Sequence, residues 1–157
     1  MPTVDAPIRN VHFDPTRPVS AWSPEVVEIV LDRGTLSDWR LLAGEIATRP
    51  WGPVARHVET VVSWDEHDGV DALMSEVIRL ARERIDRAAR ERYASELRRR
   101  RTEAGLTQRE LAALAGTSES RLSAYENAAV APTTTVLGRL EAVLDVCAAD
   151  ARTARLG

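Results

Sequence analysis

The stretch TQRELAALAGTSESRLSAYENA, residues 107–128, predicts two short helices joined by a tight turn. Thr107, with a glutamate three residues later, has the pattern of a capping box at the start of the first helix. Gly116 permits a sharp turn, and Ser118 is placed to cap a second helix over residues 119–126. Alanines on one face of the first helix are small enough to let the second helix cross it closely.

Spaced positions on both sides extend this pattern over residues 93–147, about a third of the chain. They are Leu97, Gly105, Leu106, Thr107, Gln108, Leu111, Ala112, Gly116, Thr117, Ser118, Leu122, Ser123, Glu126, Asn127, Pro132, Leu137, Leu140 and Leu144. In these positions the segment resembles the Cro/cI-type (XRE) family of helix-turn-helix DNA-binding proteins. The resemblance implies a five-helix domain that places the second helix of the motif in the major groove. The family usually has glycine where this chain has Ala128, so the turn there needs a different backbone or stores slight strain.

The resemblance also implies roles for the side chains of the motif. The residues expected to read base edges are Ser118, Glu119, Ser120 and Arg121, with Ala124 one turn further on. Arg121 can donate two hydrogen bonds to a guanine, which is worth about 1–3 kcal/mol of discrimination. Glu119 can accept a hydrogen bond from a cytosine amino group. The residues expected to contact phosphates are Thr107, Gln108, Asn127, Arg98, Arg99 and Arg100, although the three arginines have the alternative of forming a solvated helix face.

Arg101 and Glu126 match a buried ion pair that is common in this family, so we expect them to be structural. Because such proteins usually bind as dimers, the resemblance implies a homodimer on a palindromic operator in double-stranded DNA. Neither the long helical pattern of residues 71–103 nor the helix expected at residues 134–146 has a decisive heptad repeat that would identify the dimer interface.

The N-terminal half also has a helical pattern. Four prolines in residues 1–22 predict an arm or an irregular segment, and Ser23 followed by Pro24 predicts a helix start. Further helices are expected from Thr35 to about Ala47, from Pro53, and from about Asp71 onward. Because the last pattern is unusually long, we expect a break or a bend between residues 87 and 95.

The predicted fold is therefore all-α, a small N-terminal helical domain followed by a five-helix Cro/cI-like domain. We place an acidic, tryptophan-containing domain at residues 1–90, the helix-turn-helix domain at residues 91–150 and a tail at residues 151–157.

Charge is distributed unevenly along the chain. Residues 1–80 contain 7 arginines and 13 acidic residues, a net charge of −6, whereas residues 81–157 contain 14 arginines and 11 acidic residues, a net charge of +3. Either the C-terminal half faces a polyanion or its arginines only solvate helix faces. All four tryptophans lie in the N-terminal half. They either fill a small core or bind a partner protein, and the candidates for partner binding are Trp39, Trp51 and Trp64.

Few residues suggest catalysis, and we expect no enzyme activity, cofactor or metal. The three histidines are scattered, and the single cysteine excludes a cysteine-rich zinc site. The cluster WDEHD, residues 64–68, offers carboxylates and an imidazole, but a solvated loop is the simpler interpretation. Without an apolar run long enough to span a bilayer, a cytoplasmic protein with no membrane partner is expected.

Two hypotheses about function remain open. In the first, the protein is the antitoxin of a toxin–antitoxin pair, which represses its own operon and neutralises an adjacently encoded toxin through its N-terminal domain. In the second, it is a stand-alone XRE-type repressor or activator. The preference for the antitoxin rests on a resemblance of architecture alone.

Overall fold

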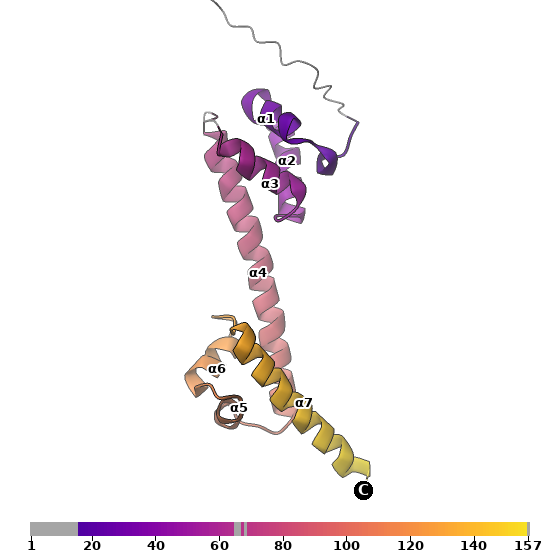
Figure 1. The fold of residues 1–157 in the computed structure, drawn as a ribbon, viewed down its shortest axis with the longest axis vertical. Helices are drawn as coiled ribbons and strands as arrows, with labels where there is room; N and C mark the ends of the chain where they lie inside the picture. The colour runs from indigo at the N-terminus through magenta and orange to yellow at the C-terminus, as the bar shows by residue number, and fades with distance from the viewer. Residues whose placement is uncertain (1–15, 65–66, 68, 157) are drawn as a thin grey trace, which may run out of the picture. The chain divides into compact units, whose positions relative to one another are not determined.

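The computed structural model describes residues 16–64, 67 and 69–156 of the 157-residue chain, and in these residues all regular structure is helical (Figure 1). The chain divides into two compact units, Met1–Arg84 and Ile85–Gly157. This division lies six residues before the boundary expected from the sequence. None of the helices in the described residues is long and apolar enough to cross a membrane.

The first unit contains a short 3-10 turn, η1 (Val19–Ala21), and the helices α1 (Pro24–Arg33), α2 (Leu36–Thr48) and α3 (Pro53–Val62). Ser23 caps α1 as predicted, because its hydroxyl accepts a hydrogen bond from the Val26 N–H. Thr35 and Asp38 form the predicted capping box of α2. Most of the N-terminal arm predicted for residues 1–22 lies outside the described residues.

The core of the first unit is formed mainly by aliphatic side chains from all four of its α-helices, the fourth being the start of α4. Its buried residues are Trp22, Val27, Val30, Leu31, Leu42, Ile46, Val54, Ala55, Val58, Val61, Val70, Met74, Ile78 and Ala81. Gly34 follows α1 with an extended backbone, and a Cβ atom at this position would overlap the Val30 carbonyl oxygen. Glycine is therefore required here by a close approach and not by a positive φ.

Helix α4 (Val70–Glu103) is continuous, so the predicted break between residues 87 and 95 is wrong. The helix contains no glycine or proline, and its central residues are mostly alanine, arginine and glutamate, which favour helices. Ion pairs between side chains three or four residues apart stabilise the helix further, and Arg79 forms such pairs with Glu76 and Glu83. An unbroken helix is therefore locally stable, and the boundary between the units falls inside it.

The second unit is built from the C-terminal part of α4 with α5 (Gln108–Ala115), α6 (Glu119–Glu126) and α7 (Thr134–Leu156) (Figure 1). Helix α7 is ten residues longer than the helix expected at residues 134–146, and the predicted tail from residue 151 is helical up to Leu156. The second core consists of Leu97, Leu111, Ala112, Ala115, Leu122, Tyr125, Leu140 and Leu144.

Three helices of the second unit end in the same way. In each, one N–H bonds to a carbonyl three residues earlier and the next N–H to a carbonyl five residues earlier, which defines the Schellman motif. The residue in the left-handed conformation is Gly105 after α4, Gly116 after α5 and Ala128 after α6, with φ values of 69°, 66° and 56°. Ala128 is the only non-glycine residue with a positive φ among the described residues.

Candidate nucleic-acid interface

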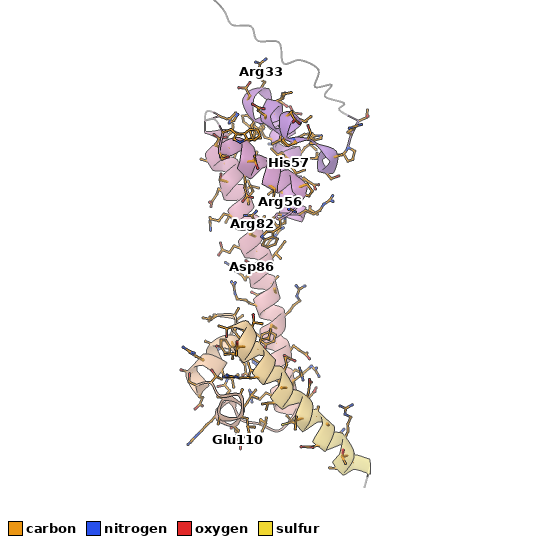
Figure 2. The ribbon with its side chains drawn as sticks, viewed as in Figure 1. Arg33, Arg56, His57, Arg82, Asp86 and Glu110 are labelled. Atoms are coloured by element: carbon orange, nitrogen blue, oxygen red, sulfur yellow. The ribbon has the colours of Figure 1, made fainter. Side chains whose placement is uncertain are left out.

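The two helices of the motif begin with well-formed caps. The Thr107 hydroxyl oxygen accepts a hydrogen bond from the Glu110 N–H at 3.2 Å, and the Glu110 carboxylate accepts one from the Thr107 N–H at 2.8 Å. Glu110 is labelled in Figure 2. The hydrogen bonds that this carboxylate accepts from the Thr107 N–H and hydroxyl hold the pKa of Glu110 below its usual value. The turn at Gly116 then leads to Ser118, whose hydroxyl oxygen accepts from the Arg121 N–H at 3.3 Å.

The residues expected to read bases occupy the first turns of α6. Glu119, Ser120 and Arg121 are exposed, and Arg121 has no ion-pair partner in the described part of the chain. The Ser118 hydroxyl is engaged in capping and shares a hydrogen bond with the Ser120 hydroxyl at 3.2 Å. Ala124 is half-buried on the following turn. Arg121 is thus the side chain of this set with a free cationic group.

Glu126 is the buried centre of a polar network, with only 2% of its surface exposed. Its carboxylate accepts two hydrogen bonds from the Arg101 guanidinium, at 2.6 and 3.1 Å, and a third from the Gln108 amide at 2.7 Å. Arg101 also donates to the Leu106 carbonyl at 2.7 Å. Burial acts to raise the pKa of Glu126, but the hydrogen bonds from Arg101 and Gln108 outweigh it and leave the pKa below its usual value. The network joins the end of α4, the start of α5 and the end of α6.

The network gives Gln108 a structural role beside the expected one. Its side-chain amide donates one of its two N–H groups to Glu126, and contact of the other with a phosphate stays a prediction. The sequence could not reveal this contact, because both residues fit the family pattern separately. Thr107 keeps its place at the exposed N-terminus of α5.

Two of the three arginines expected to bind phosphates are held by carboxylates instead. Arg99 pairs with Glu96 and Glu103 along α4. Arg100 pairs with Glu141 and Asp145 of α7, so it joins two helices of the domain. Both side chains therefore have carboxylate partners, and their contact with phosphates stays a prediction.

Arg98 and Asn127 lie together at the end of α6. Arg98 donates to the Glu126 carbonyl at 2.5 Å and to the Asn127 side-chain oxygen at 3.4 Å. This places a guanidinium next to the C-terminal end of α6, where free carbonyls carry partial negative charge. Both residues are exposed and keep further polar atoms for a phosphate.

Two exposed arginines were missed by the sequence analysis. Arg109 lies in the first turn of α5, and Arg139 lies on α7, where its Nη1 is 3.5 Å from the position of a Cβ atom at Gly116. Neither has an ion-pair partner among the described residues. The position of Arg109 one residue after the capped Thr107–Gln108 start could have indicated it from the sequence, whereas the position of Arg139 depends on how α7 packs.

The tryptophans divide into core and surface. Trp39, a candidate for partner binding, packs against the first core, and its indole N–H donates to the Val30 carbonyl at 2.8 Å. Trp51 and Trp64 are 46% and 65% exposed. Arg82 of α4, labelled in Figure 2, lies over the Trp51 ring at 5.8 Å and also donates to the Pro50 carbonyl and to Glu59. Trp51 is therefore held in place while half of its surface remains accessible.

The acidic cluster at residues 64–68 is only partly described. Asp65, Glu66 and Asp68 lie outside the described residues, and His67 hydrogen-bonds through Nδ1 to Asp71 at 3.1 Å. Elsewhere in the described ranges, no group of three or more histidine, cysteine or acidic side chains could hold a metal ion.

The comparison with known families agrees with this geometry. A family model described as Helix-turn-helix matches residues 97–148, which cover the end of α4, all of α5 and α6, and most of α7. The second unit is accordingly an XRE-type helix-turn-helix domain, of the class found in DNA-binding transcription regulators. No curated protein and no solved structure matches the chain.

Proposed function

We propose that the protein is a sequence-specific transcription regulator that inserts α6 into the DNA major groove as a homodimer. The observation that carries this proposal is the exposed N-terminal end of α6, where the Arg121 side chain has no partner among the described residues, within a segment that matches the Helix-turn-helix family. Each copy would read one half-site of a palindromic operator, with the half-sites about 34–36 Å apart. Asn127, Arg98, Arg109 and the exposed N-terminus of α5 would contact phosphates around it.

The test is binding of the purified full chain to its own upstream DNA and to random DNA across a salt series. Arg121→Ala should lose about tenfold or more in affinity for the operator and relax the preference at one position per half-site. Arg109→Ala removes the same charge from the same unit but should weaken operator and random DNA equally. Equal losses on both DNAs for both variants would refute the reading role of Arg121.

We further propose that the first unit binds a partner protein and that this partner is a toxin encoded next to the regulator. The support is the negative charge of residues 1–80, which suits a basic partner, together with two accessible tryptophans. In this role the second unit would repress the shared operon while the first covers the toxin. A stand-alone repressor or activator is the alternative, in which the first unit serves dimerisation or sensing.

The two roles are separated by expressing the adjacent reading frame alone and then with this protein. For an antitoxin, the neighbour is toxic, the full chain restores growth, and Trp51→Ala reduces rescue. Trp39→Phe is the matched control for binding, because Trp39 is partly buried against the core, whereas Trp51 is among the exposed large side chains. A harmless neighbour, or equal rescue by the second unit alone, would favour the stand-alone regulator.

A further inference from the structure

The second unit contains a cavity of about 480 Å³ next to α6. One wall is a face of α4 formed by Asp86, Ala89, Arg90 and Tyr93, and Asp86 is labelled on α4 in Figure 2. The opposite wall includes Tyr125 of α6 and residues 130–132 of the loop that follows it. Its size lies in the range of small-molecule sites, and its surface is mostly apolar, as in such sites.

Two side chains of this cavity carry buried donors that no described residue satisfies. The Arg90 Nε and the Tyr93 hydroxyl are buried and have no hydrogen-bond partner among the described residues. Burial, with a further contribution from Glu141, raises the pKa of Tyr93 to about 12, so the phenol remains a proton donor at neutral pH. Buried donors are rarely left unpaired in folded proteins, and a bound ligand is one reason for them.

The charges on the α4 wall narrow the choice of ligand. Arg90 forms no ion pair in the described part of the chain, although Asp86 lies one turn before it on the same face. An anionic group would gain from the unpaired guanidinium, whereas Asp86 would oppose a second negative charge. The exposed Val130, the buried Tyr125 and Ala89 offer an apolar surface for the rest of the molecule.

We propose that this cavity binds a small amphiphilic molecule with an apolar body and one singly charged anionic head group. The head group would accept hydrogen bonds from Arg90 and Tyr93, and the apolar body would lie against Ala89, Tyr125 and Val130. Because Tyr125 belongs to α6, a bound molecule touches the helix proposed to read DNA. A resulting change in operator affinity is a second step, and this step rests on the proposed function.

The test uses 8-anilinonaphthalene-1-sulfonate, an aromatic monoanion whose fluorescence rises in apolar sites, titrated into the folded full chain. We expect saturable binding of one molecule per chain. Ala89→Trp fills the cavity and should weaken binding tenfold or more, and Arg90→Gln should weaken it several-fold. Ala113→Trp adds the same side chain on the exposed face of α5 and should leave binding unchanged.

Non-saturable binding, or equal binding by wild type and Ala89→Trp, would overturn the cavity proposal. Since Ala89→Trp could fail to fold, methyl NMR shifts of Val130 and Leu137 on adding the probe to the wild type give a second readout. No shift at either residue would also overturn it. Operator binding is measured separately. If the probe binds but the protein shows no selective DNA binding, the proposed function is refuted and the cavity proposal stands. If operator affinity is the same with and without the bound probe, only the coupling between the cavity and DNA binding is refuted.

Discussion

Ala128→Gly should stabilise the second unit. Three helix ends there share one hydrogen-bond pattern, and only the end of α6 places a residue with a side chain in the left-handed conformation. That conformation costs a non-glycine residue about 1–2 kcal/mol. Glycine also gives the unfolded chain more conformational entropy, which lowers the stability of the folded state by about 0.4–1 kcal/mol and offsets part of the gain. The net gain is about 0.5–1 kcal/mol, or about 2–8 °C in the melting temperature of a domain of this size.

The measurement is thermal and urea unfolding followed by two signals. Far-UV ellipticity reports both units, whereas all four tryptophans lie in the first unit, so tryptophan fluorescence serves as an internal reference. The ellipticity transition of the second unit should move up while the fluorescence transition of the first stays in place.

Gly105→Ala is the matched control. A Cβ atom at Gly105 would meet no atom within 4 Å, so this substitution adds only the conformational cost. It should lower the stability of the second unit by about the amount that Ala128→Gly raises it. If Gly105→Ala destabilises the unit while Ala128→Gly leaves it unchanged or less stable, the assignment of strain to Ala128 is refuted.

Further predictions concern the buried network and one close approach. Glu126→Gln should cost about 3 kcal/mol at pH 7, because Arg101 loses its charged partner. The folded-state pKa of Glu126 is lowered, so the carboxylate contributes its full stabilisation above the unfolded pKa near 4.5, and this is lost as pH falls through the lower folded value. Urea unfolding between pH 3 and 7 should therefore show that the unfolding free energy depends less on pH in the variant than in the wild type. Equal pH dependence of the two proteins would contradict this assignment. Gln108→Ala should lower the free energy of unfolding by about 1.5 kcal/mol, because one hydrogen bond to a charged acceptor is lost. A loss of DNA affinity with unchanged stability would instead indicate that Gln108 acts mainly through a phosphate. Gly34→Ala should lower the stability of the first unit by about 1–3 kcal/mol, because the new Cβ atom would overlap the Val30 carbonyl oxygen. The change should be visible in tryptophan fluorescence, since Trp39 donates to the same carbonyl. An unchanged unfolding midpoint would show that the backbone there adapts.

Local features of the fold were predictable from the sequence. Caps depend on residues three positions apart, so Ser23, Thr35 and Thr107 marked helix starts directly. The all-helical class is confirmed, and the Helix-turn-helix match lies in the predicted part of the chain. The predicted break in α4 is wrong because length was weighed above composition, although the residues concerned favour an unbroken helix.

Contacts between distant residues were less predictable. Arg100 meets carboxylates more than 40 positions away, which requires knowing how α4 and α7 pack. The contact of Gln108 with Glu126 was missed for the same reason, since Glu126 lies across the motif. Burial also distinguishes Trp39, which packs against the core, from Trp51, which is exposed. The local sequences around the two tryptophans do not show this difference. Site residues that depend on tertiary contacts were therefore the ones that the sequence alone left uncertain.

The continuity of α4 bears on how the protein can be divided. Proteases usually cut multidomain chains at exposed linkers, but here Arg84 and Ile85 are consecutive residues of one helix. Limited digestion should therefore not release the second unit by cleavage at this boundary. A fragment that starts at Ile85 would begin with helical backbone N–H groups that have lost their carbonyl partners, and its first turns would fray. A useful fragment for DNA binding would need a new capping residue at its first position.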